Sequence, residues 1–177
     1  MPTLVFACGA ECGQQGIASV GQHFALSGTA SFSTTTVRTG ARSFRVNPTL
    51  GTGYCQALGS SQVHIWRTYI RFATLPTLSC ELATIGNVAN VPGVYFNASD
   101  SKIYAGYLDI TPQFGATGIA VTTGVWYRLD FKINISANPW TIDVSIDGNS
   151  AAQQTKANAA GAANPAFLGV VNVSPTA

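Results

Sequence analysis

The chain has 177 residues, which suits a single domain that can bury a large core without metal or disulfide staples. Hydrophobic residues make up 46% and charged residues only 9%, which excludes intrinsic disorder and leaves a surface with little mutual repulsion. Nine Lys and Arg against seven Asp and Glu give a formal net charge of +2, too small to drive nucleic-acid binding. No segment is apolar enough to span a membrane, and residues 1–7 carry no basic leader, so we expect no membrane partner and no Sec export.

Short candidate strands follow one another through the first two thirds of the chain, separated by turn-forming residues. In chain order, strands are predicted at residues 3–7, 31–37, 43–47, 53–58, 63–73, 79–86, 93–97, 102–107 and 118–121. Residues 9–21 are rich in Gly and Gln and predict a loop, whereas the Thr- and Ser-rich residues 31–37 predict an edge strand. Residues 63–73 are long and apolar on both faces, which predicts a central strand.

The clearest pattern lies in residues 124–148, where apolar and polar side chains alternate along two strands. One face of the first strand carries Val125, Tyr127, Leu129, Phe131, Ile133 and Ile135, and one face of the second carries Trp140, Ile142, Val144 and Ile146. Small polar residues and Pro139 predict the turn between them. Asp147-Gly148 closes the second strand because both residues tolerate positive φ, and a final strand is predicted at residues 167–173.

Many short strands with Gly-rich turns predict an all-β fold, a two-sheet antiparallel β-sandwich with a jelly roll as its expected form. We expect one domain over residues 1–177. Cys8, Cys12, Cys55 and Cys80 form an even set that allows three disulfide pairings. Cys55 and Cys80 are not the close pair that a zinc site would need, so buried free thiols are favoured over zinc and over disulfides.

Several segments resemble the concanavalin A-like lectin/glucanase superfamily, specifically LamG-type jelly rolls of bacteriophage structural and bacterial surface proteins. The resemblance lies in FACGAECG (6–13), RTGARSFRV (38–46), WRTYIRFATLP (66–76), GVYFNASDSKIYAGY (93–107), TTGVWYRLDFKI (122–133) and TIDVSIDG (141–148). It covers most of the chain, but these are mainly core and turn positions, so they indicate fold rather than activity. One departure is that the chain stops soon after residues 167–173, so the usual last strand is lacking or replaced, or a sheet edge stays open for docking.

The sequence contains no recognisable catalytic set. Glu11 and Glu81 are the only glutamates, and Glu81 has no acidic residue two or four positions away, as the paired carboxylates of a glucanase would require. Asp143 and Asp147 share a face but are interpreted as solvated residues of a polar strand face. His64, Arg67, Tyr69 and Arg71 are the residue types of a polysaccharide lyase, but His64 points away from the other three, which favours a packed His and a solvated Arg face. We therefore expect no enzyme.

Two candidate binding sites follow from the resemblance. Calcium is the ion usually bound by this superfamily, and its oxygen ligands would be Asn97, Asp100 and Asp109, although strand ends and turns also favour these residues without a metal. Glycans would bind to aromatic side chains, for which the candidates are Tyr95, Tyr104, Tyr107 and Trp126. Packing in the core is the alternative for each of these aromatic side chains. No other cofactor is expected.

The favoured function is a non-enzymatic structural or adhesion module at the surface of a bacteriophage virion, as a decoration, tail or fibre component. Its partners would be other virion or surface proteins and further copies of itself, with cell-surface glycans as additional ligands. The alternative is a lectin-like carbohydrate-binding domain, with or without calcium, that works outside the cell or on its surface. A polysaccharide-cleaving enzyme is the least favoured hypothesis.

Overall fold

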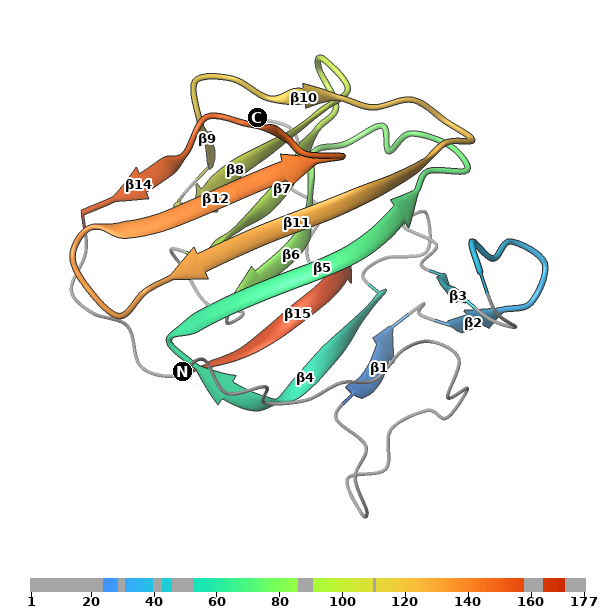
Figure 1. The fold of residues 1–177 in the computed structure, drawn as a ribbon, viewed down its shortest axis with the longest axis horizontal. Coiled ribbons are helices and arrows are strands. Elements are labelled where there is room, and N and C mark those ends of the chain that lie inside the picture. Colours follow the sequence, from blue (N-terminus) through green and yellow to red (C-terminus); the bar gives the residue numbers. More distant parts are fainter. Residues whose placement is uncertain are drawn as a thin grey trace.

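The computed structural model of the protein describes residues 24–28, 31–39, 43–45, 53–85, 91–109, 111–157 and 164–170. Across these residues the chain forms fifteen β-strands and no helix, hence none that could span a membrane. The strands build two antiparallel sheets stacked as a sandwich, with a short hairpin beside them (Figure 1). The predicted all-β, two-sheet fold class is confirmed.

The larger sheet contains eight of the described strands. They are β1 (Phe24–Gly28), β4 (Gly53–Ser61), β6 (Cys80–Ile85), β7 (Pro92–Asn97), β8 (Lys102–Leu108), β9 (Pro112–Phe114), β10 (Ile119–Ala120) and β15 (Asn164–Val170). The path through the sheet is β1-β4-β15-β6-β7-β8-β10, and β9 also pairs with β8. The last described strand thus lies inside the sheet, between β4 and β6, where it hydrogen-bonds to both neighbours.

The smaller sheet contains β5 (Val63–Arg71), β11 (Trp126–Asn134), β12 (Trp140–Ile146), β13 (Asn149–Ser150) and β14 (Gln154–Lys156). Its order is β13-β12-β11-β5, and β14 also pairs with β12. The predicted central position of residues 63–73 is wrong, because among the described strands β5 pairs with β11 alone. The apolar residues Val63 and Ile65 of its second face are exposed, so they mark an open face of the sheet and not a second buried one.

A separate hairpin is formed by β2 (Ser31–Ser33) and β3 (Ser43–Arg45). The edge strand predicted at residues 31–37 is therefore shorter than expected and pairs only with β3 among the described strands. The strand predicted at residues 3–7 and the loop at 9–21 lie outside the described residues. Four strands had no sequence prediction, namely β1, β9, β13 and β14.

The core lies between the two sheets and is filled by alternate side chains from both. From β11 and β12 the buried residues are Leu129, Phe131, Ile133, Trp140, Ile142, Val144 and Ile146, as the alternation predicts. The larger sheet contributes side chains such as Val94, Phe96 and Ile103, which are fully buried. Burying each such side chain contributes roughly 2 kcal/mol. Cys80 is a buried free thiol, as predicted for it, and burial raises its pKa to about 12.

The turn after β12 brings polar groups next to β11. Asp147 and Gly148 have positive φ angles of 51° and 89°, which confirms the prediction made for this pair. Asp147 N–H donates to the Arg128 carbonyl at 2.9 Å, and Arg128 N–H donates to Asp147 Oδ1 at 2.9 Å. These two hydrogen bonds hold the turn next to the start of β11.

Candidate functional site

The most distinctive surface of the described residues is the outward side of β5 and β11, the side of the smaller sheet that faces away from the core. Because side chains alternate along a strand, the burial of Leu129 and Phe131 requires their neighbours to point outward. Where the end of β5 pairs with the start of β11, the outward side chains are Arg67, Tyr69 and Arg71 from β5 and Trp126, Arg128 and Asp130 from β11. We call these six residues the arginine face.

The strand register sets the arrangement of these six side chains. Arg67 lies opposite Asp130, Tyr69 lies opposite Arg128, and Arg71 lies opposite Trp126. Directly opposed side chains in an antiparallel pair are about 5 Å apart at Cβ, and side chains two positions apart along a strand are about 7 Å apart. The arginine face is therefore a compact grid, two strands wide and three residues long on each strand.

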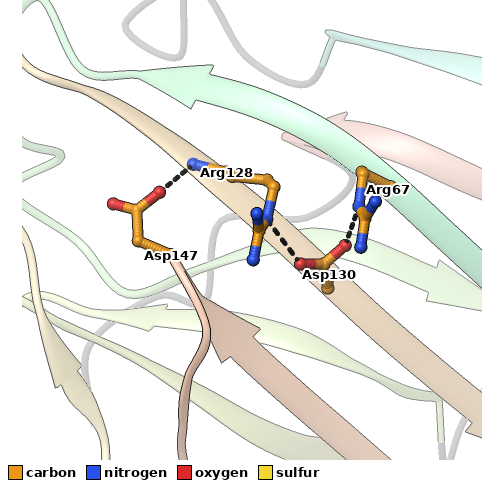
Figure 2. A network of polar contacts seen from close by, with 4 residues as sticks. All are labelled: Arg67, Arg128, Asp130 and Asp147. Carbon is orange, nitrogen blue, oxygen red and sulfur yellow. Dashed lines mark hydrogen bonds and ion pairs between the residues drawn. The ribbon is translucent and has the colours of Figure 1, made fainter.

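One carboxylate positions two of the arginines (Figure 2). Arg67 Nε donates to Asp130 Oδ1, and Arg128 Nε donates to Asp130 Oδ2 at 2.9 Å. Partial burial alone would raise the pKa of Asp130, but the hydrogen bonds from the two arginines outweigh it and hold that pKa below its usual value. The Asp130 carboxylate is therefore ionised near neutral pH, and it compensates one of the two positive charges.

Arg71 and Arg38 complete the cationic surroundings of Tyr69. Arg71 Nε donates to the Gly124 carbonyl at 3.1 Å, so this side chain is held by a neutral acceptor. Arg38, from the segment between β2 and β3, places its guanidinium carbon 3.6 Å from the centre of the Tyr69 ring. This distance is that of a cation–π contact.

Charge and exposed apolar area are both concentrated on this side of the molecule. The cationic residues of the side are Arg38, Arg67, Arg71, Arg128 and Lys132, and the acidic ones are Asp130, Asp143 and Asp147. Among the side chains that the structure describes, this side therefore carries a formal surplus of two positive charges. Three of the four large hydrophobic side chains exposed among the described residues, Val63, Ile65 and Tyr69, lie on the outward side of β5.

Two of the aromatic residues predicted to bind glycans are buried on the outward side of the larger sheet. Tyr95 is 1% exposed, and its hydroxyl donates to the Val91 carbonyl at 2.7 Å. Tyr104 is 8% exposed, stacks on Phe114 with 5.1 Å between ring centres, and donates its hydroxyl to Asp100 Oδ2. Neither ring offers a surface on which a sugar could stack.

The other two predicted aromatic residues are half-buried and lie on different sheets. Tyr107, on β8, contacts Lys156, whose Nζ is 4.3 Å from the centre of the ring. Trp126, at the start of β11, belongs to the arginine face. The structure therefore does not bring the four predicted residues together, and it places Trp126 beside arginines and Tyr69 instead.

The three residues predicted to bind calcium do not converge on one point. Asn97 Oδ1 accepts hydrogen bonds from Ser99 N–H at 3.1 Å and from Ser99 Oγ at 3.0 Å, which is the arrangement of an Asn-stabilised turn. Asp100 lies in the turn before β8, whereas exposed Asp109 follows β8 and lies 3.9 Å from Lys156 Nζ. The seven residues of β8 separate the two carboxylates by roughly 20 Å, so these residues do not fit a shared ion. No other group of three or more His, Cys, Asp or Glu side chains suited to a metal occurs within the described residues.

The carboxylates considered for catalysis lie on different sheets, and they differ in burial and in their hydrogen-bond partners. Glu81 lies opposite Tyr95 in the larger sheet, is 4% exposed, and its Oε1 has no hydrogen-bond partner. Burial raises the pKa of Glu81 to about 7. Asp143, on the smaller sheet, accepts a hydrogen bond from Gln153 Nε2, and Asp147 binds Arg128 as described above.

The side-chain directions predicted for β5 are confirmed, but the sequence did not reveal which residues of the neighbouring strand lie beside them. His64 is buried and Arg67 and Tyr69 point outward, as the alternation requires. The contributions of Arg128 and Asp130 were missed, because they join Arg67 through pairing between segments 63 residues apart. Alternation had assigned both to a polar face, but nothing local indicates which strand lies beside β11.

Comparisons with known proteins bear on the fold. No protein-family description and no curated protein matches this sequence. Domain 4 of AbnA, a GH43 extracellular arabinanase from Geobacillus stearothermophilus solved in complex with arabinotriose, matches with a TM-score of 0.60 and 16% identity, over 86% of this chain and 75% of that one. The carbohydrate-binding module CBM66 from Bacillus subtilis matches with a TM-score of 0.54 and 7% identity, over 84% of this chain and 88% of that one. At these identities the likeness establishes a shared β-sandwich fold.

Proposed function

We propose that this protein is a non-catalytic carbohydrate-binding module that holds glycans outside the cell on its arginine face. The observation that carries the proposal is the placement of Tyr69 and Trp126 on an open sheet face among fixed arginines. Tyr69 is 38% exposed and Trp126 is partly exposed, so aromatic surface and hydrogen-bond donors are accessible to the same ligand. Carbohydrates are bound by this combination, because aromatic rings pack on their C–H surfaces while polar side chains bind their hydroxyl groups.

The structural neighbours support this proposal over the virion-surface hypothesis. One neighbour is a carbohydrate-binding module, and the other is a domain of an extracellular enzyme solved with a bound oligosaccharide. Both share the fold over more than four fifths of this chain. The virion role and the expected homo-oligomer have no comparable support.

The carboxylates favour binding over catalysis. Glycoside hydrolysis needs two carboxyl groups on either side of one scissile bond. Glu81 lies in the larger sheet and is buried, whereas Asp130 is ion-paired on the smaller sheet. The proposal therefore contains no bond-breaking step, and the module would act by retaining a protein or a particle on a polysaccharide.

Affinity electrophoresis tests the proposal directly. The protein is run through native gels that contain one soluble polysaccharide each, with arabinan, xylan, mannan, polygalacturonate and alginate as probes. We expect retardation by at least one polymer, and we expect Tyr69→Ala and Trp126→Ala each to weaken that retardation by about tenfold or more in affinity, since stacked aromatic rings dominate such interfaces.

Two further variants serve as controls. Tyr69→Phe keeps the ring and its contact with Arg38, so it should retain most of the affinity. Lys102→Ala removes a cation from the larger sheet, 3.7 Å from Asp100, and should bind like the wild type. Failure of every polymer to retard the protein, or equal retardation of Tyr69→Ala and wild type, would overturn the proposal.

A further inference from the structure

We propose that the glycan recognised by the arginine face is acidic, with its charge carried by carboxylate groups on the sugar rings. This inference rests on the proposed function and adds the chemical class of the ligand. It starts from one local fact, which is that four of the chain's nine cationic side chains surround a single exposed tyrosine.

The surroundings of Tyr69 follow from the register and from one ring contact. Arg67 and Arg71 are its neighbours two positions away on β5, and Arg128 lies directly opposite on β11. Arg38 lies over the ring at 3.6 Å from its centre. Like charges this close repel one another in the free protein. A bound anion would relieve that repulsion, so the arrangement favours a negatively charged ligand.

The bonds that position the arginines leave their outer ends for a ligand. In Arg67, Arg71 and Arg128 alike, the observed hydrogen bond is made by Nε, the donor next to the side-chain stem. Among the described residues no hydrogen bond is made by the terminal Nη groups of these three side chains. A guanidinium held in this way keeps a planar pair of donors that matches the two oxygens of a carboxylate.

The charge balance favours a glycan over a nucleic acid. Asp130 compensates one of the two arginines that it binds, whereas Arg71 is bound to a neutral carbonyl. The surplus of about two charges is enough to select a carboxylated sugar but falls short of the six to ten phosphate contacts of typical DNA-binding proteins. The exposed apolar surface of Ile65 and Tyr69 next to the arginines also suits sugar rings better than a charged backbone.

A matched pair of ligands separates the contribution of the carboxylate charge to the affinity from the contribution of the sugar rings. Isothermal titration calorimetry is carried out with polygalacturonate oligomers and with the same oligomers after reduction of their carboxyl groups to alcohols. We expect the reduced oligomers to bind at least tenfold more weakly, and we expect the affinity for the acidic oligomers to fall as NaCl rises from 50 to 200 mM. Equal affinity for the two forms would overturn the acidic assignment and leave carbohydrate binding intact.

Variants then assign the effect to the arginines. Arg71→Ala and Arg128→Ala should each lower the affinity for the acidic oligomers by about tenfold and the affinity for the reduced form by a clearly smaller factor, because a hydrogen bond to a hydroxyl group is weaker than one to a carboxylate. Arg71→Lys keeps the charge but loses the planar fork, so it should fall between wild type and Arg71→Ala. Lys102→Ala, on the other sheet, should bind like wild type. Thermal unfolding of each variant checks that the fold is intact, and equal losses for both forms of the oligomer would contradict the inference.

Two other anions complete the test. Dextran sulfate carries sulfate esters on a neutral sugar chain, and tighter binding to it than to polygalacturonate would overturn the assignment to carboxylates. Tighter binding to a single-stranded DNA 20-mer would overturn the assignment to glycans as a class. Preference for polygalacturonate over both, at equal charge concentration, supports the inference.

Discussion

The outward faces of the two sheets both carry tyrosines, but the surroundings of these tyrosines differ. On the larger sheet, Glu81, Tyr95 and Tyr104 lie side by side across three strands and are almost completely buried. On the smaller sheet, Tyr69 and Arg128 lie side by side across two strands, and Tyr69 remains exposed. Both sets alternate with core residues in the same way. A tyrosine on an outward face is therefore part of the interior on one side of this molecule and part of a candidate binding surface on the other.

Local features explain why the face of the larger sheet is closed. A Cβ atom at Gly118 would come within 2.5 Å of the Tyr104 ring, which means that this backbone lies directly on the aromatic ring. A Cβ atom at Gly106 would similarly come within 2.8 Å of the Tyr95 ring. Glycine thus lets the chain approach these rings, whereas the described residues of the smaller sheet have no corresponding close approach.

The largest expected effect comes from truncating one tyrosine on each face. Tyr95→Ala should lower the free energy of unfolding by about 4 kcal/mol, because it opens a cavity among buried groups. Tyr69→Ala should lower it by less than about 1 kcal/mol, because the ring is partly solvated. Urea unfolding measures both values. Similar losses of stability for the two variants would contradict the statement that one face is closed and the other open.

The next effect is a pH dependence between about pH 4.5 and 7, which comes from the closed face. Burial raises the pKa of Glu81 from 4.5 to about 7 in the folded chain, so the folded protein keeps a proton that the unfolded chain releases. The free energy of unfolding should therefore decrease as pH rises from about 4.5 to 7, by up to roughly 3 kcal/mol from this group. Below pH 4.5 both states hold the proton, and the contribution is constant.

Glu81→Gln should remove this dependence, because the amide cannot ionise. The difference in unfolding free energy between wild type and Glu81→Gln is measured by urea unfolding at several pH values between 4 and 8. As the pH rises from 4.5 to 7, the Glu81→Gln variant should become more stable relative to the wild type. A difference that stays constant over this range would show that Glu81 is solvated in the folded protein.

A smaller effect tests the close approach at Gly118. Gly118→Ala should lower the free energy of unfolding by about 2 kcal/mol, because the stacked and hydrogen-bonded Tyr104 ring cannot move away from the new methyl group. Ala116→Ser also adds one heavy atom to this segment, but at an exposed position, and should change the value by less than about 0.5 kcal/mol. Equal values for the two variants would mean that the segment does not cover Tyr104.

The smallest effect on stability is expected on the open face. Asp130→Asn should lower the free energy of unfolding by less than about 1 kcal/mol, because the two ion pairs lie at the surface. Its difference from wild type should shrink between 0.05 and 1 M NaCl, since salt screens exposed charges. A loss of several kcal/mol that is independent of salt would indicate that the arginine face is buried like the other one.

The sequence predicted much of the fold but little of the candidate site. Alternation in residues 124–148 identified which side chains of β11 and β12 enter the core, and the Asp147-Gly148 turn was predicted from its residues. Alternation distinguishes the two sides of a strand but does not indicate what covers each side. Tyr104 and Trp126 were therefore equally good candidates until the segment at Gly118 and the position of β5 were known. Pairing of Arg67 with Asp130 depends on strand order, which is not encoded locally.

The central claim is that ligands bind on the arginine face of the smaller sheet, and amide chemical-shift mapping tests it most directly. Polygalacturonate oligomers are titrated into the ¹⁵N-labelled protein, and the shifted amide signals are assigned to residues. We expect the shifts to concentrate in residues 65–71 of β5 and 126–132 of β11, with few changes in β6 to β8. Shifts that concentrate around Tyr95 and Tyr104 on the larger sheet, or no shifts with acidic and neutral oligomers alike, would contradict the account.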